Sequence, residues 1–180
     1  MSTPTIARSM VAREGREMQR YAPSGARLVA GVVALSPDKT KVLLVSSTAR
    51  QDKFVLPKGG FETDEPMPED AAMREAWEEG GIIGRISKPL GVIDDPRPPK
   101  IFVMDVAGGG IVPPRAEYYF FEMEIEKELD KWPESERRIR KWATYNEAMS
   151  ELINRPELIE ALNRSSLIKT SITSACSHRF

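Results

Sequence analysis

The chain of 180 residues carries 26 Lys and Arg against 27 Asp and Glu, so its formal net charge at pH 7 is −1, and 41% of its residues are hydrophobic. This length and composition are typical of a single folded domain, and the near balance of charge excludes a global attraction to nucleic acid or anionic lipid. Because Cys176 and His178 are the sole cysteine and histidine, a disulfide framework and a Cys- or His-based zinc site are excluded as well.

The sequence also bears on membranes and location. No apolar run approaches the roughly 18 residues that cross a bilayer, and the N-terminal segment lacks the apolar stretch of a secretory signal. We therefore expect a protein of the cytoplasm, and also of the nucleus, with neither a membrane nor a nucleic acid as its partner.

The chain begins with a polar, arginine-rich arm at residues 1–24, which we expect to stay mobile until an anionic ligand engages it. The folded domain is predicted to span residues 25–164, and a loose tail follows at 165–180. Within the domain, residues 27–36 and 42–47 are rich in Val, Leu and Ala and predict a β-hairpin.

A short strand at residues 54–56 is followed by a tight LPKGG turn and then by a helix. Prolines and carboxylates from Pro66 onward predict the first turn of that helix, and Gly80 and Gly81 predict its end. Strands mixed with two helices indicate an α/β or α+β sandwich with helices on both faces of a mixed sheet. The later predicted elements are strands at 82–94, 116–126 and 141–145, a Gly/Pro-rich loop at 105–115, and a helix at 146–162 that Pro156 bends or divides.

The predicted central helix separates apolar from acidic side chains around its axis. At about 100° per residue, the apolar face takes Ala72, Met73, Ala76 and Trp77, and the opposite face takes Glu75, Glu78 and Glu79. Like charges at this spacing repel, and a hard divalent cation reverses the repulsion because it prefers oxygen ligands. An acidic helical face is also commonly just solvated. The neighbouring glycine turn favours a ligand site, since glycine lets a ligand approach the main chain.

Residues 59–82, GGFETDEPMPEDAAMREAWEEGGI, resemble the Nudix box. Eight residues match the family pattern in the same order: Gly59, Glu65, Arg74, Glu75, Glu78, Glu79, Gly81 and Ile82. One departure is that eight residues rather than seven separate Glu65 from Arg74, which we assign to the loop before the helix. From the residues alone, Arg74 is either a surface partner of Asp70 or Glu78, or a brace for the glutamates.

The resemblance implies a Nudix-type α/β/α sandwich and a phosphohydrolase that uses Mg²⁺, with Mn²⁺ as a substitute. It implies that Glu75 and Glu79 are metal ligands, that the Lys58 carbonyl is a third, and that Glu78 accepts the proton of the attacking water. Arg74 and Glu65 are implied as supporting residues. This chemistry is physically sound, because metals neutralise phosphoryl charge and acidify water while a carboxylate takes its proton.

Beyond the box, residues 42–60 and 137–142 resemble the diphosphoinositol polyphosphate phosphohydrolases, especially fungal members that also act on diadenosine polyphosphates. The resemblance implies a small polyphosphate substrate. The charge pattern agrees, since eight acidic residues and one basic residue lie between Glu62 and Glu79 while basic residues gather elsewhere. By the resemblance, the phosphate-binding positions are Arg27, Ser47, Thr48, Arg50, Lys58, Gly59, Gly60 and Arg138. Basic runs such as the one around Arg138 are also commonly solvated surface.

Three functional readings remain open from the sequence. The first is the phosphohydrolase of diphosphoinositol polyphosphates, diadenosine polyphosphates and polyphosphate. The second is a non-catalytic sensor of inositol pyrophosphates, whose expected signature is a broken box. The third is a Nudix pyrophosphatase for nucleotide sugars or other nucleotides, for which fewer basic positions would matter.

Overall fold

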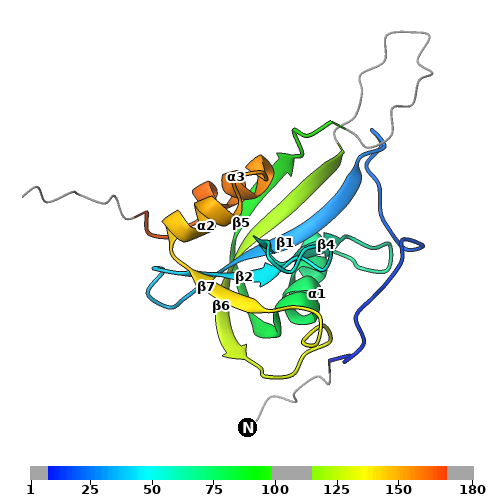
Figure 1. The fold of residues 1–180 in the computed structure, drawn as a ribbon. Coiled ribbons are helices and arrows are strands. Elements are labelled where there is room, and N and C mark those ends of the chain that lie inside the picture. Colours follow the sequence, from blue (N-terminus) through cyan, green and yellow to red (C-terminus); the bar gives the residue numbers. More distant parts are fainter. Residues whose placement is uncertain (1–7, 99–114, 170–180) are drawn as a thin grey trace, which may run out of the picture.

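The computed structural model describes residues 8–98 and 115–169 (Figure 1). Its strands are β1 (Arg27–Leu35), β2 (Val42–Ser46), β3 (Phe54–Val55), β4 (Lys58–Gly60), β5 (Ile82–Asp94), β6 (Ala116–Glu128) and β7 (Arg140–Ala143). Its helices are α1 (Pro68–Gly80), α2 (Tyr145–Glu151) and α3 (Pro156–Arg164). None of the helices in these described ranges has the length and apolar character needed to cross a bilayer.

The strands form one mixed sheet of seven strands with β1 near its centre. The path runs β3-β2-β1-β6-β5, where β1 and β6 are parallel and the neighbouring pairs are antiparallel. The end of β1 meets β2 at Leu35 and Val42, as the predicted hairpin requires. Along its first half, β1 pairs instead with β4, and β7 pairs with β2.

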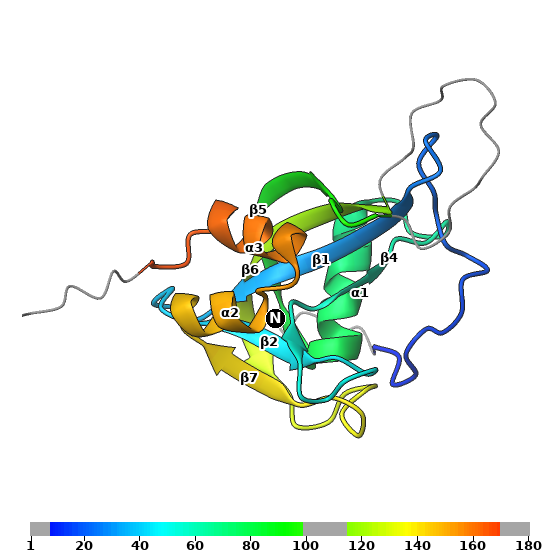
Figure 2. The same ribbon diagram turned by 45° about the horizontal axis from the view of Figure 1, so that its top comes forward.

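Helices cover both faces of the sheet, with α1 on one side and α2 and α3 on the other (Figure 2). Alternate residues of β1 supply the two cores: Ala30 and Val32 pack toward α1, whereas Val29 and Val33 pack toward α2 and α3. This alternation follows from the period of a strand, whose successive side chains point to opposite faces. The predicted α/β/α sandwich with a mixed sheet is confirmed.

Helix α1 begins and ends where the sequence predicts. Pro68 occupies its first turn, and the Asp70 carboxylate accepts a hydrogen bond from the Met67 main-chain N–H at 3.1 Å. Gly81 terminates the helix in the left-handed conformation, with φ of 62°, and donates to the carbonyl of Trp77. A residue without a Cβ adopts this conformation without steric cost.

One local prediction is corrected and another is confirmed. The LPKGG turn continues as strand β4, because Lys58, Gly59 and Gly60 pair with β1. The helical segment predicted at 146–162 is divided at Pro156, which is the first residue of α3 and cannot donate a hydrogen bond to a preceding turn. The loop predicted at 105–115 lies almost wholly outside the described residues.

Both terminal segments make contacts that the sequence analysis did not foresee. Residues 8–24 run along the domain, where Gln19 is 8% exposed and bridges to Glu62 next to β4. At the other end, Leu167 is buried and the N–H of Ile168 donates to the carbonyl of Lys39 at 2.8 Å. Residues 165–169 are therefore anchored to the domain, contrary to the prediction of a loose tail from residue 165. Residues 1–7 and 170–180 lie outside the described ranges.

Candidate active site

Helix α1, strand β4 and the N-terminal segment line a polar cavity of about 240 Å³. Its acidic lining residues are Glu62, Glu75, Glu78, Glu79 and Glu134, and its basic ones are Arg13, Arg27, Lys58 and Arg74. The structure thus brings the three helix glutamates of the motif together. These three are only 5–7% exposed, so the acidic face is not simply solvated surface.

Burial controls the titration of these carboxylates. Burial and then the charge of Glu79 raise the pKa of Glu75 to about 8. Burial likewise raises the pKa of Glu78 and of Glu79. Buried like charges destabilise each other, so the cluster needs positive charge close by.

Arg74 supplies part of that charge through a fork of contacts. Its guanidinium donates to Glu65 at 2.6 Å, to Glu75 at 2.7 Å and to Glu78 at 3.2 Å. It also donates to the carbonyl of Gly60 at 2.8 Å, which ties α1 to β4. The extra residue before the helix therefore does not prevent Glu65 from reaching Arg74, and Arg74 is a brace within the cavity rather than a surface partner.

Strand β4 approaches the glutamates through its glycines. A Cβ atom built on Gly59 would lie 2.0 Å from a carboxylate oxygen of Glu75, so the absence of a side chain there makes room for Glu75. The main-chain N–H of Lys58 donates to Glu79 at 3.0 Å. Burial lowers the pKa of the Lys58 amine to about 8, although the charge of Glu79 opposes this.

The predicted phosphate-binding arginines lie in different settings. Arg27 lines the cavity, donates to the side-chain oxygen of Gln19 at 2.6 Å, and has its pKa lowered mainly by burial. Arg138 forms ion pairs with Glu79 and Glu134 and donates to the carbonyl of Ser46 at 2.7 Å. Arg138 is therefore engaged with carboxylates of the site in this structure.

Three other predicted positions do not line the cavity. Ser47, Thr48 and Arg50 belong to the connection between β2 and β3, where the N–H of Ser47 donates to the carbonyl of Lys53 at 2.7 Å. The Arg50 side chain is 66% exposed and pairs with Asp52 at 3.6 Å. The structure thus separates these residues from the glutamate cavity.

Other lining residues were missed in the sequence. Glu134 comes from the connection between β6 and β7, and Arg13, Gly15 and Gln19 come from the N-terminal segment. Nothing in their spacing relates them to α1, because the fold alone brings these distant segments together.

The donor set fits a divalent cation. Within residues 8–98 and 115–169, no three His, Cys, Asp or Glu side chains are already arranged to hold a metal ion. However, Glu75 and Glu79 are buried carboxylates, and burial and then repulsion by Glu79 raise the pKa of Glu75. Oxygen donors of this type suit Mg²⁺ or Mn²⁺, which would relieve that repulsion.

The α/β/α sandwich places buried helix carboxylates beside the glycines of β4, an arrangement that suits metal-dependent phosphate chemistry. The NUDIX domain model matches residues 25–163. Nudix hydrolase 12, mitochondrial, of Arabidopsis thaliana is 39% identical over 153 residues, covering 76% of this chain and 71% of that protein. The chain therefore belongs to the Nudix family and is a Nudix hydrolase.

Further similarities extend this comparison. Nudix hydrolase 21, chloroplastic, of Arabidopsis thaliana is 35% identical, covering 86% of this chain and 73% of that protein. Diphosphoinositol polyphosphate phosphohydrolase 3-alpha of Homo sapiens is 28% identical, covering 76% and 75%. The solved structure of a NUDIX hydrolase from Nitrosomonas europaea has a TM-score of 0.56 at 18% identity, covering 77% of this chain and 87% of that one. That similarity supports the fold.

Proposed function

We propose that this Nudix hydrolase uses Mg²⁺, or Mn²⁺ in its place, to cleave the pyrophosphate group of diphosphoinositol polyphosphates, with diadenosine polyphosphates and polyphosphate as further substrates. The observation that carries the proposal is the cavity that joins buried helix glutamates to several basic side chains. Acids of this kind hold a cation, and the basic groups match a substrate with many phosphates.

The residues of the cavity divide the chemical work. Glu75 and Glu79, with the Lys58 carbonyl, would hold the cation, and Arg74 with Glu65 would keep the carboxylates in place. When bound, a divalent cation supplies neutralisation of phosphoryl charge and acidification of water. Glu78 would accept the proton of the attacking water, and the burial that raises its pKa makes it a stronger base for this role.

Basic side chains account for the choice of a polyphosphate. Arg27 and Lys58 line the cavity, so they are placed to hold phosphates that do not react. Glycines at 59 and 60 would let phosphate approach the main chain of β4. The similarity to a human diphosphoinositol polyphosphate phosphohydrolase supports the same substrate class. Ser47, Thr48, Arg50 and Arg138 would reach the outer phosphates of a substrate larger than the cavity itself.

A substrate panel with a matched pair of variants tests the proposal. With Mg²⁺ present, the wild-type protein should release phosphate from diphosphoinositol pentakisphosphate, and diadenosine hexaphosphate, linear polyphosphate and ADP-ribose rank the alternatives. Glu79→Gln should lower turnover by about 10³-fold or more because it removes a cation ligand. Glu160→Gln changes an exposed surface pair with Arg164 and should leave turnover unchanged. Normal phosphate release by Glu79→Gln would contradict the assignment.

The same panel decides between the rival functions. Cleavage of ADP-ribose or nucleotide sugars alone would favour a nucleotide pyrophosphatase. Binding of diphosphoinositol pentakisphosphate without any product would favour a sensor, although each carboxylate of the REAWEE segment is present here. We also propose a cytoplasmic and nuclear location, while relatives in Arabidopsis thaliana carry chloroplastic and mitochondrial names; imaging of the tagged full chain tests this.

A further inference from the structure

The N-terminal segment lines the glutamate cavity with Arg13, Gly15 and Gln19 and is attached to the domain at several points. The Trp77 indole N–H on α1 donates to the carbonyl of Ser9 at 2.8 Å. Near β4, the N–H of Arg20 donates to the carbonyl of Phe61 at 2.9 Å. Between these two attachments, Glu14 pairs with Arg137 of the β6–β7 connection at 3.2 Å. Residues 9–20 thus form a strap, and we use that name for them.

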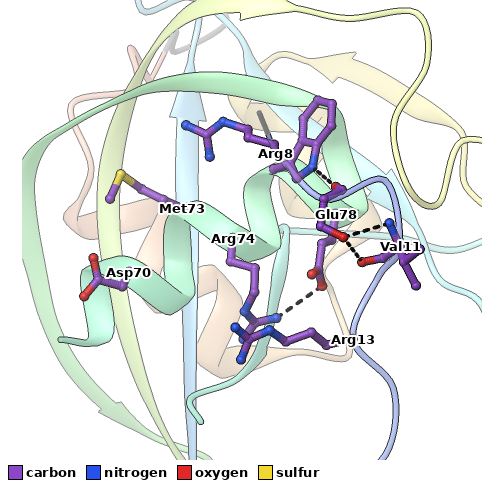
Figure 3. A pocket seen from close by; sticks show the side chains of 9 residues that line it. Arg8, Val11, Arg13, Asp70, Met73, Arg74 and Glu78 are labelled. Atoms are coloured by element: carbon purple, nitrogen blue, oxygen red, sulfur yellow. Dashed lines mark hydrogen bonds and ion pairs between the residues drawn. The ribbon is translucent and has the colours of Figure 1, made fainter. Parts of the chain in front are cut away.

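Arg13 is the strap residue that faces the acids of the site. It lines the glutamate cavity and also the neighbouring hollow of about 340 Å³ between the strap and α1. Figure 3 shows Arg13 and Arg74 at one end of that hollow, with Glu78 linked to Arg74.

The side chain of Arg13 forms ion pairs that a phosphate ligand can replace. It pairs with Glu62, whose side chain is 16% exposed, and at 2.9 Å with Asp64, and the side chains of Arg13 and Asp64 are 38% and 47% exposed. The Arg13–Asp64 pair contributes little to stability, because water and salt screen exposed ion pairs. A guanidinium gains more from a phosphate, with which it forms two parallel charge-assisted hydrogen bonds.

We infer that Arg13 is a further substrate-binding residue, which exchanges its contacts with Glu62 and Asp64 for a phosphate of the polyphosphate in the cavity. This inference rests on the proposed function for the nature of the substrate. It assigns to the strap a direct part in recognition, with Ser9 and Arg20 fixing its two ends. Asp64 is then a competitor for the guanidinium, not a support for it.

Because Asp64 would compete with a phosphate for Arg13, an experiment can tell whether Arg13 binds the substrate or only holds the strap to the domain. Calorimetry with inositol hexakisphosphate as an unreactive probe measures binding without turnover. Arg13→Gln should weaken binding about tenfold or more, because it removes charge-assisted hydrogen bonds. Asp64→Asn should bind as tightly as wild type or about twofold to fivefold more tightly, because it removes one of the two carboxylates that compete for Arg13. Arg85→Gln removes a surface pair with Glu124 outside the cavity and should bind like wild type.

The outcomes are distinct from those of the proposed reaction. Equal binding by Arg13→Gln and wild type, no binding by wild type, or weakening by Asp64→Asn as large as that of Arg13→Gln would each overturn the inference. Urea midpoints of all variants should agree, and Arg13→Lys should recover part of the lost affinity. If binding follows the expected order but no pyrophosphate is cleaved, the proposed reaction fails and the role of Arg13 stands.

Discussion

Arginine side chains lie next to the buried glutamates of α1 and offset their negative charge. Arg74 contacts Glu75 and Glu78, and Arg138 joins Glu79 to Glu134. These arginines keep the buried carboxylates tolerable, since an unpaired buried charge is strongly destabilising. A cation that binds Glu79 must therefore compete with Arg138, and the displaced guanidinium would become available to a phosphate.

A substitution at Gly59 would test how closely strand β4 must approach Glu75. Gly59→Ala places a Cβ 2.0 Å from a carboxylate oxygen of Glu75, so that carboxylate must move away. We expect kcat/KM to fall about 100-fold or more, because displacements of about 1 Å at a site have effects of this size. Unfolding in urea should change little, since the end of a flexible side chain can shift.

Gly80→Ala is the matched control for this experiment. A Cβ at Gly80 would meet its nearest atoms, in Ile82 and Leu43, at 3.6 Å, which is ordinary contact. The control should keep wild-type kcat/KM. Wild-type activity in Gly59→Ala would show that the position of Glu75 beside β4 is unimportant.

The part of the site that was predictable lies within one helix. The spacing of Glu75, Glu78 and Glu79 places them on one face wherever the helix sits, so the sequence suffices for them. Glu134 and Arg13 could not be predicted, because only tertiary folding carries their segments to α1. For the same reason the positions of Ser47, Thr48 and Arg50 relative to the cavity depend on the path of a connection that no local pattern determines.

Glycine and proline residues explain both the helix boundaries that were predicted correctly and the strand that was missed. Glycines at the end of α1 and Pro156 at the start of α3 set boundaries through backbone sterics alone. Strand β4 was mistaken for a turn because Pro57 and two glycines disfavour strands locally. Pairing with β1 overrides that preference, since β1 would otherwise have unpaired main-chain groups along half its length.

The end of α1 offers a test with two neighbouring glycines. Gly81→Ala places a residue with a Cβ in the left-handed backbone conformation, and that Cβ would lie 2.7 Å from the Trp132 ring. We therefore expect the free energy of unfolding to fall by about 2 kcal/mol or more. Gly80→Ala lies within the helix and should gain about 0.5–1 kcal/mol, because glycine has the greater backbone entropy when unfolded. Urea unfolding measures both changes, and the same sign for both would contradict this account of the helix end.

Glu122 connects segments that are far apart in the sequence. Its side chain is 2% exposed, accepts a hydrogen bond from the N–H of Ser166 at 2.7 Å, and lies 3.5 Å and 3.4 Å from the amines of Lys39 and Lys88. The first hairpin, strand β5 and the segment after α3 therefore meet at one carboxylate on β6. This explains why residues 165–169 are held although their sequence looked like a tail.

Glu122 should give the stability of the protein a measurable pH dependence. Burial opposes its ionisation, but the hydrogen bonds from Ser166 and the charges of Lys88 and Lys39 outweigh burial and lower its pKa below the usual value. A carboxyl whose pKa is lower in the folded state contributes fully above its unfolded pKa and loses that contribution as the pH falls through its folded pKa. Glu122→Gln should therefore lower the unfolding free energy by about 1–3 kcal/mol at neutral pH.

The difference between wild type and Glu122→Gln should then shrink as the pH falls below the folded pKa of Glu122, because the wild-type carboxyl becomes protonated and its ionic partners lose their counter-charge. Urea unfolding of both proteins across the acid range measures this convergence. Glu160→Gln, which removes an exposed i,i+4 pair on α3, should differ little from wild type throughout. A gap for Glu122→Gln that stays constant with pH would mean that packing of its side chain, rather than its charge, holds the three segments together.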